Sequence, residues 1–104
     1  MKGKKMSYTE MKIQINTELQ EPPMYKVIFL NDNVTTVQFV VQCLVDHFSC
    51  TEIAAMKIAN EINTSGSSVA AVMPFQIAEQ KGMDIMVSAR KAGFPLQIKI
   101  EKNL

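Results

Sequence analysis

The chain has 104 residues, a length that fits one domain with a single modest hydrophobic core. Its 11 lysine and arginine residues nearly balance 10 aspartate and glutamate residues, and the net charge of +1 excludes the strongly basic surface typical of nucleic-acid or anionic-membrane binding. No apolar stretch approaches the ~20 residues of a transmembrane helix, and the N-terminus lacks the apolar region of a signal peptide. We therefore expect a cytoplasmic protein.

The residue inventory argues against catalysis. His47 is the only histidine, and it lies at the end of a predicted helix, where a solvated residue is more common than a general base. Cys43 and Cys50 are seven residues apart, a spacing that fits no metal or redox motif, so we expect both to be reduced and structural. The sequence has no cluster with metal-ligand spacing and no glycine-rich phosphate loop. We expect no enzyme, no cofactor and no metal.

The N-terminal segment differs in character from the rest of the chain. Residues 1–21 are polar and lysine-rich, and Pro22 and Pro23 then mark a boundary. Residues 12–16 alternate like a short strand, but this strand would be brief and solitary. We expect residues 1–21 to form a flexible extension and residues 22–104 to form one folded domain.

An apolar run over residues 24–30 predicts a buried strand. Residues 31–33, Asn-Asp-Asn, then favour a turn, and the apolar period changes to that of a helix over residues 36–48. Thr35 is predicted to cap this helix, with Gln38 completing a capping box. The predicted apolar stripe of the helix comprises Val37, Val40, Val41, Leu44 and Phe48.

The second half of the chain predicts two further helices and two further strands. Residues 49–52 have the form of a capping box, so a second helix should follow at once and end at Gly66, which tolerates a left-handed conformation. Residues 69–73 are typical of a short buried strand, and Pro74 suits the first turn of a third helix. Residues 96–101 alternate between apolar and polar, as a strand with one buried face does. The predicted apolar faces of the two helices comprise Ala55, Ile58, Ala59 and Ile62, and Ala78, Gly82, Ile85 and Ala89.

The predicted element order is β-α-α-β-α-β. One sheet covered by helices is the economical way to bury three strands and three amphipathic helices. The predicted fold class is therefore α/β, an α+β sandwich in which three helices pack on one face of a three-stranded antiparallel sheet.

Several separated stretches resemble the signature of the ClpS adaptor family. That family reads roughly Pro-Pro, Tyr-Lys-Val, Leu-Asn-Asp-Asp and Thr-Pro-Met-Glu-Phe-Val, with Ala-Glu-Thr-Lys and Pro-Leu further on. The resemblance covers residues 22–102 in order and with compatible spacing, so it is more specific than any one motif. The matching stretches here are Pro22-Pro23, Tyr25-Lys26-Val27, Leu30-Asn31-Asp32-Asn33, Thr35, Phe39-Val40-Val41, Ala78-Glu79-Gln80-Lys81 and Pro95-Leu96.

The resemblance implies an adaptor and not an enzyme. ClpS proteins bind the free N-terminus of N-degron substrates, which begin with a bulky hydrophobic residue, and hand them to the ClpA ATPase that feeds the ClpP protease. The implied partners are the N-terminal domain of a ClpA-type ATPase and N-degron substrates, with no nucleic acid, no membrane and a monomeric chain. By position, Glu79 and Lys81 would belong to the surface that docks on the ATPase.

The resemblance also assigns the binding residues. An α-ammonium group has donors and no acceptor, so its site needs carboxylate and amide oxygens. By position, Asn31, Asp32 and Asn63 would bind it, although residues 31–33 taken alone are also an ordinary turn. The pocket for the first side chain, together with its rim, would comprise Asn33, Thr35, Val37, Val40, Ala59, Ile62 and Leu96.

Five positions depart from the family pattern. Asn33 replaces an aspartate, Thr36 a proline, Val37 and Ala59 methionines, and Asn63 a histidine. These changes leave open a pseudo-adaptor that docks on the ATPase and modulates it without recognising N-degrons. A ribosomal-stalk-like interaction domain is a further alternative, because that fold also packs helices on three strands, but it does not account for the polar corner. A small-molecule enzyme ranks last.

Overall fold

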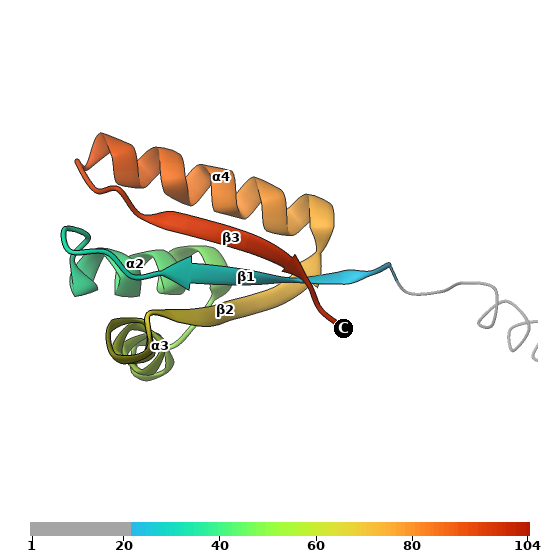
Figure 1. Ribbon diagram of the computed structural model, residues 1–104, viewed down its shortest axis with the longest axis horizontal. Helices are drawn as coiled ribbons and strands as arrows, with labels where there is room; N and C mark the ends of the chain where they lie inside the picture. Colours follow the sequence, from blue (N-terminus) through green and yellow to red (C-terminus); the bar gives the residue numbers. More distant parts are fainter. Residues whose placement is uncertain (1–21) are drawn as a thin grey trace, which may run out of the picture.

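The computed structural model describes residues 22–104, and its six elements follow the predicted β-α-α-β-α-β order (Figure 1). The predicted strand-like segment at residues 12–16 and the predicted extension lie outside the described residues. Among the described residues, no helix is long and apolar enough to cross a membrane. The elements are β1 (Met24–Leu30), α2 (Val37–Phe48), α3 (Glu52–Ser65), β2 (Ser67–Pro74), α4 (Phe75–Lys91) and β3 (Gln97–Lys102).

The sheet is antiparallel with strand order β2-β1-β3, so the first strand lies in the centre. The three helices cover the sheet face that carries Val27 and Phe29, both fully buried (Figure 1). A register shift between Val27 and Ile28 marks a bulge in the pairing of β1 with β2. The predicted fold class is thereby confirmed.

The buried helix faces largely follow the predicted stripes. In α4, Ala78, Gly82, Ile85 and Ala89 are all buried. In α3, the buried residues are Ala55, Ala59 and Ile62, while Ile58 packs partly buried against them. The stripe of α2 differs from the prediction, because its buried residues are Val40, Cys43 and Leu44, whereas Val37 is 48% exposed.

The two cysteines are free thiols, as expected. Cys43 belongs to the core between α2 and the sheet, and Cys50 is half-buried. Burial, with a smaller contribution from the charge of Asp46, raises the pKa of the Cys43 thiol to about 11.

The N-cap residues of two helices, α2 and α3, differ from the predicted ones. Thr36, and not Thr35, caps α2, and its side-chain oxygen accepts a hydrogen bond from the amide of Phe39 at 3.1 Å. The predicted capping box at residues 49–52 is also wrong. Thr51 caps α3, whereas Ser49 ends α2 in the left-handed conformation with φ of 56°. The Thr35 hydroxyl donates to Asp32, and Ser49 serves as the C-cap of α2, so each helix begins after the next available threonine.

Gly66 joins the end of α3 to the beginning of β2. It adopts φ of 92°, and its amide donates to the Ile62 carbonyl at 2.9 Å, which ends the helix as predicted. The Gly66 carbonyl accepts a hydrogen bond from the amide of Asn31 at 2.9 Å. This bond fixes the polar corner after β1 against the last turn of α3.

Two glycines should therefore respond in opposite ways to the same substitution. Gly66→Ala should lower the free energy of unfolding by about 1–2 kcal/mol, because an alanine resists the left-handed conformation. Gly82→Ala should raise it by up to about 1 kcal/mol through helix propensity, because its new methyl group would meet Ile98 and Ile100 at ordinary contact distances of 3.5 and 3.7 Å. Urea unfolding of both variants measures the two signs, and a shift in the same direction would contradict this account.

Candidate functional site

A cavity of about 310 Å³ lies where the polar corner meets the ends of α2 and α3. The hydrogen bond between Asn31 and Gly66 brings residues 31–36 beside the last turn of α3, about 30 positions later in the chain. The size is within the range of small-ligand pockets. The cavity is lined by Asn31, Asp32, Asn33, Thr35, Thr36, Val37, Val40, Ala59, Ile62 and Asn63.

Asp32 organises the corner through three hydrogen bonds. Its Oδ1 accepts from the amides of Val34 and Thr35 at 2.7 and 2.6 Å, and its Oδ2 accepts from the Thr35 hydroxyl at 2.7 Å. A carboxylate offers about four acceptor positions. One position on Oδ2 therefore remains for a donor that enters the cavity.

The pKa of Asp32 lies below its ordinary value. Desolvation is the largest single influence and raises the pKa, but the hydrogen bonds from Thr35 and Val34 and the positive charge of Arg90 together outweigh it. The carboxylate also lies just before the N-terminus of α2, where the helix dipole favours a negative charge. At neutral pH the corner thus holds one fixed negative charge.

The remaining polar groups of the rim are neutral amides. Asn31, Asn33 and Asn63 are all exposed and line the cavity, so their side-chain oxygens can accept hydrogen bonds from a ligand. Asn63 belongs to the last turn of α3, which carries no basic residue. No basic side chain of that turn therefore offsets the negative end of the helix dipole beside the cavity.

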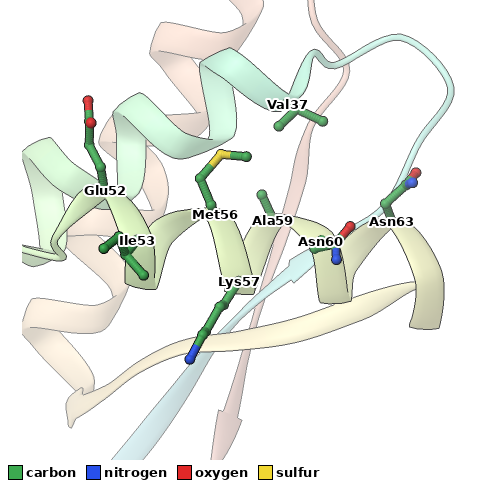
Figure 2. Close-up of a pocket in the computed structure, with 8 residues that line it drawn as sticks. All are labelled: Val37, Glu52, Ile53, Met56, Lys57, Ala59, Asn60 and Asn63. Atoms are coloured by element: carbon green, nitrogen blue, oxygen red, sulfur yellow. The ribbon is translucent and has the colours of Figure 1, made fainter.

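The cavity has an apolar side opposite the polar rim. Val40, Ala59 and Ile62 are buried core residues that also line the cavity, and Val37 stands above them at the edge. Figure 2 shows Ala59 of α3 and Val37 of α2 facing each other across this space. Because Ala59 has only a methyl group, the floor leaves room for a large apolar side chain.

The structure brings together nine of the ten predicted binding residues. The exception is Leu96, which is 1% exposed in the core and does not line the cavity. Its backbone carbonyl accepts a hydrogen bond from Arg90 at 2.8 Å, which holds the chain as it enters β3.

Thr36 lines the cavity and was not predicted. The signal for it was Asp32 three residues before Thr35, since an aspartate in that position engages the Thr35 hydroxyl and leaves Thr36 to cap the helix.

The two predicted docking residues lie on α4 and line none of the cavity. Glu79 is exposed. Lys81 is half-buried, and its ammonium group lies 5.8 Å from the centre of the Phe48 ring.

Residues 22–104 hold no group of three His, Cys, Asp or Glu side chains that could bind a metal ion. The fold and the cavity together define a small α/β domain whose cavity has one carboxylate and several amides above an apolar floor. The sequence matches the family model of the ATP-dependent Clp protease adaptor protein ClpS over residues 20–99. The chain belongs to the ClpS family.

Individual relatives agree with this assignment. The chain is 42% identical over 86 residues to the ATP-dependent Clp protease adapter protein ClpS of Campylobacter jejuni, covering 83% of this chain and 90% of that protein. It is 33% identical over 97 residues to the ClpS adapter of Helicobacter hepaticus, covering 93% and 98%. The solved structure of Agrobacterium tumefaciens ClpS2 bound to L-phenylalaninamide has a TM-score of 0.76 at 32% identity, and the match covers 80% of this chain and 100% of that chain.

The lowered pKa of Asp32 predicts a pH dependence of stability. Above the unfolded value of about 3.9 the carboxylate is ionised in both states and its stabilising effect is complete. As the pH falls from there through the lower folded value, that effect is lost. The difference in unfolding free energy between wild type and Asp32→Asn should therefore shrink between about pH 5 and pH 2. Urea unfolding across this range measures it.

Thr35→Val provides the matched control, because it removes one hydrogen bond that lowers the pKa of Asp32 and keeps the carboxylate. The pH-dependent difference measured against Asp32→Asn should be smaller in the Thr35→Val background. A difference that stays constant across the range would mean that the carboxylate of Asp32 does not stabilise the corner.

Proposed function

We propose that this chain binds the free amino terminus of polypeptides that begin with a bulky hydrophobic residue, and that it delivers them to a ClpA-type ATPase of the Clp protease. The observation that carries the proposal is the position of Asp32. Its carboxylate keeps one acceptor position free at the rim of a cavity of about 310 Å³ whose floor is apolar. Such a cavity suits a ligand in which a cationic group and an apolar group are attached to the same carbon atom.

The chemistry of an α-ammonium group matches the rim. The group has three donors and no acceptor, and the rim offers Asp32 with the amide oxygens of Asn31 and Asn63. The hydrogen bond to Asp32 is the charge-assisted one and therefore the strongest. The α-carbon would lie between the rim and the floor, with its side chain directed to Val40, Ala59 and Ile62.

A solved relative supports this arrangement. Agrobacterium tumefaciens ClpS2 was solved bound to L-phenylalaninamide, a molecule that joins a free α-amino group to an aromatic side chain. The ligand has the two chemical features for which the cavity of this chain is suited.

One observation favours a second candidate function, the pseudo-adaptor. Three hydrogen bonds from its own loop already occupy Asp32, and its neighbours Asn33 and Asn63 are neutral. In this alternative Asp32 only shapes the corner, and the chain docks on the ATPase without binding N-degrons. Peptide binding separates the two functions.

Delivery is the second half of the proposal. We place the docking surface on α4, where Glu79 is exposed and Lys81 packs on Phe48. Residues 1–21 are proposed to be required for delivery and not for binding. The protein is proposed to act as a cytoplasmic monomer and to catalyse no reaction itself.

Substitution of Asp32 tests the binding half. Asp32→Ala should weaken a Phe-first peptide roughly thirtyfold, and Asp32→Asn about tenfold, because the amide keeps an acceptor but loses the charge. Fluorescence anisotropy with a labelled peptide gives both dissociation constants. Asp84→Asn, which removes the same charge from an exposed position on α4, is the matched control and should bind like wild type.

Acetylation of the peptide removes the same interaction from the other side. Wild type should bind acetylated peptide poorly, and Asp32→Asn should lose little more. If a folded Asp32→Asn variant binds free-amine peptide as tightly as wild type, Asp32 is a turn residue and the pseudo-adaptor is the better description.

The small side chain of Ala59 predicts the preference for the first residue. Wild type should bind Phe-first and Trp-first peptides at least as tightly as Leu-first peptides. Ala59→Met fills the floor and should weaken the Trp-first peptide by about tenfold more than the Leu-first peptide. Ala92→Met, which adds the same side chain at an exposed position, is the control. A Leu-first peptide that binds wild type tenfold tighter than the aromatic peptides would refute this preference.

A further inference from the structure

A second hollow continues the cavity along α3. It is an open trough of about 580 Å³ between the beginning of α2 and the outer side of α3 (Figure 2). It shares Val37, Ala59 and Asn63 with the cavity, so the two form one continuous depression. The trough is lined by Val37, Glu52, Ile53, Met56, Lys57, Ala59, Asn60 and Asn63.

Ile53 and Met56, two apolar residues of the trough, contribute little to the fold. Ile53 is 75% exposed and Met56 is 52% exposed, whereas α3 packs on the core through Ala55, Ala59 and Ile62. In Figure 2 the Met56 side chain of α3 is directed toward Val37 of α2, so both sides of the trough are apolar here. With Val37, which is 48% exposed, these side chains form an apolar patch along the trough, and exposed apolar patches mark sites of interaction.

A polypeptide held at Asp32 must leave the cavity along some path. The trough shares three lining residues with the cavity, whereas the hollow formed by Val34, Arg90 and Phe94 shares none. The continuous path therefore runs over Val37 and Ala59 toward Met56. This direction places the chain beyond the first residue on α3.

The spacing of an extended chain selects the residue that meets the trough. Alternate side chains of an extended polypeptide point to the same side and lie about 6.6 Å apart. Along α3, the step from Ile62 and Ala59 to Met56 and Ile53 is six residues, or about 9 Å at 1.5 Å per residue. When the first side chain lies on the cavity floor, the third lies at the trough and the second points away.

We propose that the trough binds the third side chain of the same polypeptide whose amino terminus is held at Asp32, and that it selects an apolar residue there. This inference rests on the proposed function. Glu52 and Lys57, which both line the trough, carry opposite charges, so it discriminates by apolar contact and not by the sign of charge. The occupied region extends the site from one residue to three.

Three peptides that differ only at their second and third residues test the proposal. They begin Phe-Ser-Leu, Phe-Ser-Ser and Phe-Leu-Ser and are otherwise identical. Wild type should bind the first about fivefold more tightly than the second, since a leucine side chain would be partly buried, while the third should gain less than about twofold. Fluorescence anisotropy measures the three dissociation constants.

A pair of methionines supplies the variant and its control. Met56→Ser should abolish the gain from leucine at the third position and leave the Phe-Ser-Ser peptide unchanged. Met83 on α4 has nearly the same exposure, 53%, but lines no part of the trough, so Met83→Ser should keep the gain.

The outcomes separate this inference from the proposed function. If no free-amine peptide binds, both are overturned. If the peptides bind with equal affinity, or if leucine at the second position gives the larger gain, only the trough is overturned. Sedimentation analysis tests whether a second copy of the chain occupies the trough instead. A wild-type dimer that Met56→Ser dissociates would assign the trough to that second copy and overturn the proposal.

Discussion

The hydrogen bond from the Asn31 amide to the Gly66 carbonyl is the contact on which the site depends. The pairing of β1 with β2 ends at Leu30 and Ser67, and this hydrogen bond extends the contact between the two segments by one residue on each. It holds the polar corner against the end of α3. Together with the packing of α2 on α3, it holds Asp32 and Asn63 at one cavity although they are far apart in the sequence. A sheet register thus positions the polar rim of the cavity.

In the proposed function, Asp32 combines a structural role and a binding role in one carboxylate. Its hydrogen bonds to Val34 and Thr35 shape the loop before α2, and they also hold the charge in place at the cavity. A charge fixed in this way needs no rearrangement when a cationic ligand arrives. Because one carboxylate has both roles, Asp32→Ala can disturb the loop as well as remove the charge. It must therefore be compared with the isosteric Asp32→Asn before a loss of binding is assigned to charge.

The fold and most of the cavity were predictable from the sequence. The change of apolar period at residues 31–33 located the corner, and the family resemblance joined it to Ala59 and Asn63, which periodicity alone could not do. Leu96 was wrongly assigned to the pocket, because an apolar residue that lines a pocket and one buried beneath it follow the same apolar periodicity in the sequence. The cap of α2 was misplaced because two adjacent threonines offer the same hydroxyl, and only the position of Asp32 decides between them. The trough was not predicted, since exposed apolar residues on α3 carry no pattern of their own.

The burial of the Cys43 thiol determines how readily oxidants react with it. With a pKa of about 11, roughly one thiol in ten thousand is ionised at pH 7. The thiolate is the reactive species, so the native core is nearly inert toward peroxides and disulfides. Reaction becomes appreciable only in molecules whose α2 has separated from the sheet. Oxidative damage at this position would therefore accumulate in proportion to the time that each molecule spends open, and not to the time that it spends folded.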